Sequence, residues 1–152
     1  MTRIEALIIG DELLDGRVTD TNTVRLAQKL GEMGLKIQQR TTITDDLDII
    51  ICEAKRIAER ETKVCVVSGG LGPTSDDITA ESFARLLGVE LERDAAQAQK
   101  ITDRLIGRGR EVTANQLKQA DRPLGAEVIE NHHGTAPGFA VVYQGCRFVL
   151  VP

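Results

Sequence analysis

At 152 residues, with 41% apolar and 28% charged side chains, the chain has the length and composition of one soluble globular domain. A net charge of −4 and few aromatic residues (three Phe, one Tyr, no Trp) argue against nucleic-acid binding, which needs a basic face or exposed rings. Without a signal peptide or an apolar run of roughly 20 residues, the sequence predicts a cytoplasmic protein with no membrane partner.

The first part of the chain predicts strands and helices in alternation. The apolar run 4–9 predicts a strand, and the alternating residues 35–43 predict a second, less buried one. Between them, a helix capped by Asp20 or Thr21 should extend to about Gly31. The expected apolar face of this helix consists of Leu26, Leu30 and Met33.

The middle of the chain continues this alternation. Residues 44–46 should cap a helix that runs to about Arg60, and residues 63–67 form an apolar run typical of a buried parallel strand. A further helix is expected at 78–87, with Gly88 ending it. Because strands joined through helices run parallel with right-handed crossovers, the sequence predicts an α/β domain with helices on both faces of the sheet.

The last part predicts a helix at 94–106 and a second, short helix that starts at a Thr-x-x-Gln capping box at 113–116. Residues 143–146 suit a hairpin turn, so at least one of the strands around it should be antiparallel. The strands expected here lie at 127–129, 139–143 and 147–151. Since the chain stops at Pro152 directly after a strand, we expect a single domain, 1–152, truncated at its C-terminal end.

The three cysteines, Cys52, Cys65 and Cys146, are far apart and form no Cys-x-x-Cys pair. The sequence therefore supports neither a zinc knuckle nor a disulfide framework, and it suits a reducing compartment. Cys65 and Cys146 lie in apolar runs, which predicts that both act as small residues of the hydrophobic core.

The candidate site follows the strand at 63–67. Residues 68–77 read Ser-Gly-Gly-Leu-Gly-Pro-Thr-Ser-Asp-Asp and lead into the helix at 78–87. Glycines let the backbone approach a ligand and a helix N-terminus presents free N–H groups, so this loop predicts an anion site. It lacks both the dinucleotide fingerprint and the Lys-Ser/Thr of a nucleotide P-loop. Asp76 and Asp77 would repel a phosphate unless a cation lies between them, and either could instead cap the helix.

Further acidic and small residues follow the other strands. Asp45 follows the second strand, and the acidic loop 11–16 follows the first. Parallel strand ends gather at one edge of a sheet, so the acids and the glycine loop should share one crevice that suits Mg²⁺ or Mn²⁺. The loop 134–138 is either a turn or another wall of that crevice. The pair His132–His133 has no third His or Cys at ligand spacing, which disfavours a histidine metal site.

Three motifs give the sequence a specific resemblance. Residues 9–16 read Ile-Gly-Asp-Glu-Leu-Leu-Asp-Gly and precede Asp20-Thr21-Asn22; residues 69–81 carry the glycine loop; and residues 134–139 read Gly-Thr-Ala-Pro-Gly-Phe. In this order, over essentially the whole chain, they resemble the N-terminal domain of the competence/damage-inducible protein A (CinA) family. That domain belongs to the molybdopterin-binding, MoaB/MogA-like superfamily.

The resemblance implies a three-layer α/β/α sandwich with a mostly parallel sheet and at least one antiparallel strand. It also implies metal-dependent hydrolysis of the pyrophosphate in ADP-ribose, giving AMP and ribose 5-phosphate, with Mg, Mn or Co as the divalent cation. Many full-length members add a domain that deamidates nicotinamide mononucleotide, for which 152 residues leave no room. The implied partners are a small-molecule nucleotide and further copies of the chain in a dimer or trimer.

Two other functions stay open. The closest competing subfamily transfers adenylate to molybdopterin, and its loop usually reads Gly-Gly-Thr-Gly where this chain has Gly69-Gly70-Leu71-Gly72. That difference favours the hydrolase over molybdenum cofactor biosynthesis. The third function is a non-catalytic nucleotide-binding module, which would bind nucleotide without turnover and would not respond to chelators.

The resemblance and the chemistry of the loop together give the candidate site residues. Asp77 and Asp45 are the candidate catalytic residues. The candidate metal ligands are Asp76, Asp77, Asp45 and Glu12. The candidate phosphate- and nucleotide-binding residues are Gly10, Glu12, Asn22, Ser68, Gly69, Gly70, Leu71, Gly72, Pro73, Thr74, Asn115, Gln119, Pro137 and Gly138.

Overall fold

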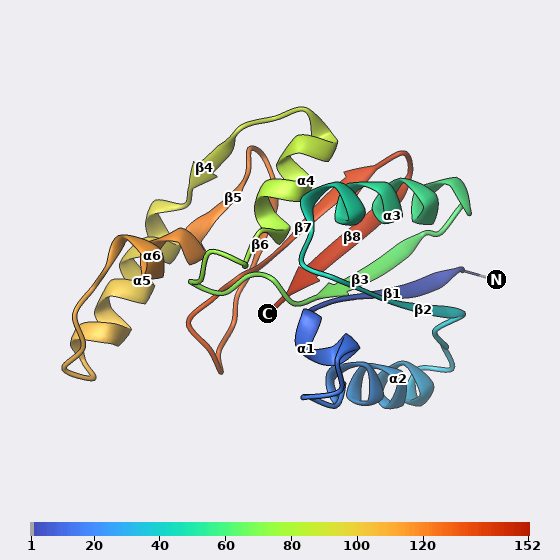
Figure 1. The fold of residues 1–152 in the computed structure, drawn as a ribbon, viewed down its shortest axis with the longest axis horizontal. Helices are drawn as coiled ribbons and strands as arrows, with labels where there is room; N and C mark the ends of the chain where they lie inside the picture. The colour runs from blue at the N-terminus through green and yellow to red at the C-terminus, as the bar shows by residue number, and fades with distance from the viewer. Residues whose placement is uncertain (1) are drawn as a thin grey trace.

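The computed structural model describes residues 2–152, and a six-stranded sheet runs through its centre (Figure 1). The spatial order of its strands is β2-β1-β3-β8-β7-β6. Only β7 runs against its neighbours, since it pairs antiparallel with both β6 and β8 while the other pairs are parallel. In chain order the strands are β1 (Ile4–Ile9), β2 (Gln39–Ile43), β3 (Val64–Ser68), β6 (Glu127–Ile129), β7 (Gly138–Tyr143) and β8 (Cys146–Val151).

Helices cover both faces of this sheet, so the expected three-layer α/β/α architecture is confirmed. Helices α3 (Leu47–Glu59) and α4 (Thr79–Leu87) lie on one face, and α1 (Asp11–Leu14) and α2 (Asn22–Glu32) lie on the other (Figure 1). Asp46 caps α3 by accepting a hydrogen bond from the N–H of Ile49, as the sequence indicates.

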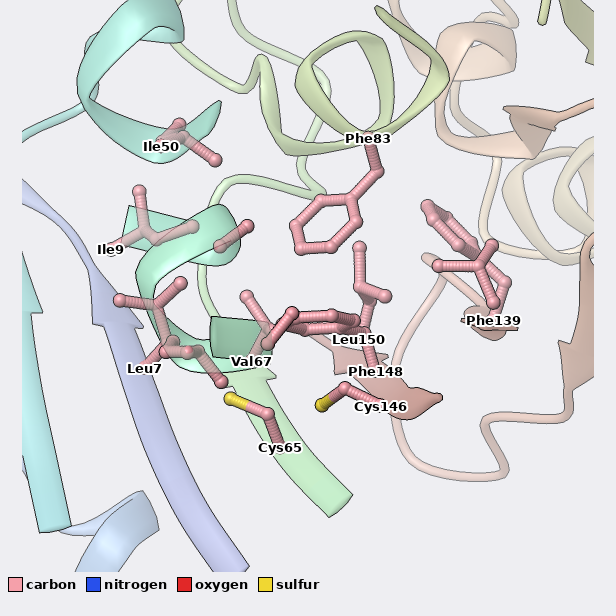
Figure 2. Close-up of a cluster of buried hydrophobic side chains, with 14 of the residues drawn as sticks. Leu7, Ile9, Ile50, Cys65, Val67, Phe83, Phe139, Cys146, Phe148 and Leu150 are labelled. Atoms are coloured by element: carbon pink, nitrogen blue, oxygen red, sulfur yellow. The ribbon is translucent and has the colours of Figure 1, made fainter. Parts of the chain in front are cut away.

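The main core lies between the sheet and helices α3 and α4 (Figure 2). The rings of Phe83 on α4 and Phe148 on β8 meet with centroids 5.1 Å apart. Cys65 and Cys146 are buried in this core as free thiols, which confirms their predicted role. Burial raises the pKa of the Cys65 thiol above its ordinary value and that of Cys146 to about 11, so both stay protonated at neutral pH.

A smaller lobe lies at one end of the sheet (Figure 1). It contains helix α5 (Ala95–Ile106), helix α6 (Ala114–Leu117), the 3₁₀ turn η1 (Lys118–Ala120) and a two-stranded antiparallel sheet of β4 (Leu91–Arg93) and β5 (Asp121–Pro123). Ile101, Leu105 and Ala120 form a second small core in this lobe. The predicted capping box is present, with Thr113 and Gln116 each accepting from the other's backbone N–H.

Three local expectations are corrected. Residues 11–14 form the helix α1 rather than only a loop, and the strand predicted at 35–43 begins at Gln39. Met33 does not join the apolar face of α2: its side chain is 71% exposed because α2 ends at Glu32. The β4–β5 pair has only three residues in each strand, too few for an alternation signal to predict it. Within residues 2–152 no helix is both long and apolar enough to cross a membrane.

Candidate functional site at the carboxyl edge of the sheet

The glycine loop is folded tightly against the end of β1. Gly69 and Gly70 follow β3 directly and have φ angles of 106° and 71°, in the region that favours glycine. A Cβ atom at Gly69 would lie 2.1 Å from the carbonyl oxygen of Ile9, and one at Gly70 would lie 2.1 Å from Thr79 Oγ1. Glycine is therefore required at both positions for the loop to reach its place beside β1.

Hydrogen bonds decide which loop amides are open to a ligand. The Gly69 N–H donates to the carbonyl of Val151 on β8 at 3.2 Å, so it is already used within the fold. The N–H groups of Gly70, Leu71 and Gly72 donate to no acceptor among residues 2–152. These three amides, rather than that of Gly69, are the donors that an anion at this loop could use.

Asp77 stabilises the loop through hydrogen bonds with Thr74 instead of capping α4. Its Oδ2 accepts hydrogen bonds from Thr74 N–H at 2.8 Å and from Thr74 Oγ1 at 2.6 Å. The cap position of α4 is Ile78, which provides no side-chain hydrogen bond. The alternative that Asp76 or Asp77 caps this helix is therefore wrong, because Ile78 occupies the cap position and Asp77 turns back to order the preceding turn.

The ends of β1, β2 and β3 meet at one crevice of about 510 Å³, as the parallel topology predicts. Five of its side chains are carboxylates, and one is the cation of Arg17, which is paired with Asp15 at 2.6 Å. The crevice is lined by Ile9, Gly10, Asp11, Glu12, Arg17, Asp45, Gly69, Gly70, Thr74, Asp76 and Asp77.

The surroundings of Asp45 disfavour the charged form of its carboxyl group. Burial raises the pKa of its carboxyl above the ordinary value of 3.8, and the negative charges of Asp11, Glu12 and Asp77 raise it further. The N–H of Asp11, which donates to Asp45 Oδ2 at 3.1 Å, opposes the shift only in part. A charged Asp45 therefore destabilises the folded protein, which is typical of a residue kept for function.

We expect Asp45→Asn to stabilise the domain by about 0.5 kcal/mol at pH 7, a small gain because Asp45 is only partly buried. A raised folded pKa means that stability falls as the pH rises through that pKa, so the gain should disappear below the ordinary value of 3.8. Urea unfolding of the wild type and the variant, at pH 7 and below pH 3.8, measures this difference in the free energy of unfolding. Asp48→Asn is the control, since it removes an exposed carboxylate from the first turn of α3 and should lose stability instead.

The remaining candidate residues fall around this crevice. Asn22 and Ser68 line an adjoining pocket of about 250 Å³, where the Asn22 amide donates to Ser68 Oγ at 3.2 Å. Leu71, Gly72 and Gln119 line a small pocket of about 50 Å³ that shares Gly70 and Asp77 with the crevice. The candidates outside the walls of these three cavities are Pro73, Asn115, Pro137 and Gly138.

Arg17 and Lys118 were not predicted as site residues, and Asp11 was expected at the crevice only as part of the acidic loop 11–16. Asp11 and Arg17 line the crevice because α1 folds the acidic segment back over the end of β1. Lys118 reaches the glycine loop from the smaller lobe, a contact between residues 44 positions apart. Its place between the candidates Asn115 and Gln119 is the signal that could have identified it.

The glycine loop, the acidic crevice and the sheet order define a three-layer α/β domain with a candidate ligand site at the carboxyl edge of its sheet. This chain belongs to the family described as "Probable molybdopterin binding domain", whose model matches residues 5–152. Its relatives include proteins named CinA-like or putative competence-damage inducible, which confirms the resemblance drawn from the three motifs. A CinA-like protein from Anaeromyxobacter sp. (strain K) is 43% identical over 150 residues, covering 99% of this chain and 36% of the relative. The chain thus spans about a third of the length of the curated relatives it matches.

Solved structures agree with this assignment. A CinA protein of unknown function from Thermoplasma acidophilum is 34% identical, with a TM-score of 0.85, and the match covers 99% of this chain and 88% of that one. The molybdopterin biosynthesis enzyme MoaB from Thermus thermophilus has a TM-score of 0.63 at 19% identity, covering 100% and 81% of the two chains. At that identity the second likeness shows the fold alone.

Proposed function

We propose that this domain binds a phosphorylated small molecule of the molybdopterin class in the acidic crevice. The observation that carries the proposal is the glycine loop, whose Gly70, Leu71 and Gly72 amides have no acceptor among residues 2–152 and adjoin the crevice. Family membership supports the same ligand class. In this proposal the amides hold the phosphate, and the adjoining pocket with Asn22 and Ser68 receives the organic part of the ligand.

Equilibrium titration with a phosphorylated pterin, followed by pterin fluorescence, tests this function. Saturable binding of the phosphorylated pterin, with at least tenfold weaker binding of the same pterin without its phosphate, is the expected result. Equal affinities for the two pterins would show that the loop does not recognise phosphate and would remove the proposal. Light scattering of the same sample checks the implied dimer or trimer.

Hydrolysis of the pyrophosphate in ADP-ribose is the second candidate function. The specific observation in its favour is the acidic crevice around Asp45, because five carboxylates beside a phosphate site call for a compensating cation. When bound, a divalent cation would neutralise the pyrophosphate and acidify a water molecule. Asp45 is the candidate general base, since its raised pKa brings it nearer to the pH at which a base works well.

The donor chemistry of the crevice fits such a cation, since its candidate ligands are all carboxylate oxygens. No group of three or more His, Cys, Asp or Glu in the described chain, residues 2–152, is arranged to hold a metal ion. The crevice therefore matches a cation that arrives with the substrate, because Mg²⁺ usually takes one or two carboxylates and completes its shell with phosphate oxygens and water.

An assay of AMP release from ADP-ribose with Mg²⁺, Mn²⁺ or Co²⁺ decides between the two functions. Turnover that chelation abolishes and that Asp45→Asn lowers by about 100-fold or more supports the hydrolase. Asp48→Asn, on the exposed first turn of α3, should leave the rate unchanged. Nucleotide binding without turnover, insensitive to chelators, would instead identify a non-catalytic module.

A further inference from the structure

Lys118 joins the smaller lobe to the glycine loop. It lies on η1, directly after α6, and its Nζ donates a hydrogen bond to the Thr74 carbonyl at 2.6 Å. The other side of the same turn is braced by Asp77, which accepts from Thr74 N–H and Oγ1. Thr74 is thus held between a carboxylate from its own loop and an ammonium from a distant part of the chain.

The charge of Lys118 is not compensated by an ion pair. Among residues 2–152, no carboxylate lies within 4.0 Å of its ammonium, whereas Arg17 in the crevice is paired with Asp15 at 2.6 Å. A carbonyl oxygen satisfies one ammonium donor but leaves the positive charge in place. Lys118 is therefore the cation at this site whose charge remains free to act on an anion.

The position of Lys118 suits this role. The small pocket that it lines shares Gly70 and Asp77 with the large crevice, and Leu71 and Gly72 of the loop lie in the same lining. Asp77, Glu81 and Asp121 also line this pocket, but none of them forms an ion pair with Lys118 within 4.0 Å. The free amides of Gly70, Leu71 and Gly72 lie in the same loop. An anion held by these amides would share the lining of the small pocket with the ammonium, and the attraction between the two charges is strongest at such short range.

We infer that Lys118 is the residue that neutralises the phosphate at the glycine loop, in addition to anchoring Thr74. The loop itself lacks the lysine that a nucleotide P-loop places among its glycines, and Lys118 supplies that charge from another lobe. This inference rests on the proposed binding of a phosphorylated ligand at the loop. It explains how an anion enters a crevice with five carboxylates and a single, already paired arginine.

Four variants separate the charge of Lys118 from its hydrogen bond. Lys118→Gln keeps a donor for the Thr74 carbonyl but removes the charge, Lys118→Arg keeps the charge, and Lys118→Met removes both. Lys55→Gln is the matched control, because it removes one positive charge from an exposed position on α3. Isothermal titration with AMP and with inorganic pyrophosphate, in one magnesium buffer at low and high salt, gives the affinities. Thermal unfolding confirms that each variant is folded.

We expect Lys118→Gln and Lys118→Met to bind both probes about tenfold more weakly than the wild type at low salt, with a smaller dependence on salt. Lys118→Arg and Lys55→Gln should bind within about twofold of the wild type. Wild-type affinity in Lys118→Gln would overturn the inference and leave Lys118 as an anchor only. If the wild type itself bound neither probe, the loop would not hold a free phosphate and this inference would fail, whereas the pterin titration decides the proposed function separately.

Discussion

Replacing Arg60 with methionine should destabilise the domain by about 3–5 kcal/mol, because it leaves the carboxylate of Glu5 buried without its main partner. Glu5 lies on β1 and is 1% exposed. Arg60 Nη2 donates to Glu5 Oε2 at 2.7 Å, and Thr62 and Arg3 each donate to Oε1 at 2.7 Å. Urea unfolding at pH 7 measures the loss, and the double variant Glu5→Leu/Arg60→Met should recover much of it, since the buried carboxylate of Glu5 is then gone and Glu53, the other partner of Arg60, keeps Arg56 at 3.6 Å.

The nearby arginine Arg56 provides the matched control. Its guanidinium lies 3.6 Å from Glu53 and its side chain is 65% exposed, so Arg56→Met should cost less than about 1 kcal/mol. If Arg60→Met cost no more than Arg56→Met, the buried Glu5 cluster would contribute no more to the free energy of unfolding than an exposed ion pair does.

The same cluster makes a prediction about pH. Burial raises the pKa of Glu5, but the hydrogen bonds from Arg60, Thr62 and Arg3 outweigh it and hold the pKa below the ordinary value of 4.5. A lowered folded pKa gives stability that is present above the unfolded value and is lost as the pH falls through the folded one. The difference between the wild type and Arg60→Met should therefore be full at pH 7 and should shrink below about pH 4.

The elements that the sequence predicted well are those whose local pattern and burial agree. The apolar runs of β1, β3 and β8, the helical period of α3 and the capping box of α6 each carry their own signal. The gathering of Asp45, Glu12 and the glycine loop at one sheet edge followed from parallel topology alone. These are consequences of backbone geometry, which short-range sequence determines.

The details that escaped prediction depend on contacts distant in sequence. Gly69 was a candidate phosphate donor, yet its N–H is used by Val151, which lies 82 positions later on β8. Asp77 fits the pattern of a helix cap, but the hydroxyl of Thr74 gives it a better partner within the loop. Lys118 joined the site only because the smaller lobe folds back onto the loop. No local pattern in the chain encodes these pairings.

Gly69→Ala should both weaken the fold and remove ligand binding. The new Cβ would lie 2.1 Å from the carbonyl oxygen of Ile9, and the φ of 106° strains any residue with a Cβ. The loop cannot move away freely, because the Gly69 N–H is tied to Val151 on the other neighbouring strand. Strain and overpacking together should cost about 2–5 kcal/mol in urea unfolding.

Gly69→Ala should also affect function directly, because Ile9 leads into the opposite wall of the crevice at Gly10 and Glu12. Pushing the loop from β1 displaces the free amides from the acids, and a shift of about 1 Å should reduce phosphate-dependent binding on the order of 100-fold. Gly16→Ala is the matched control: its φ of 80° carries similar strain, but no atom lies within 4 Å of the new Cβ. If the two variants bound a phosphorylated probe equally well, close contact between the loop and β1 would not be what forms the site.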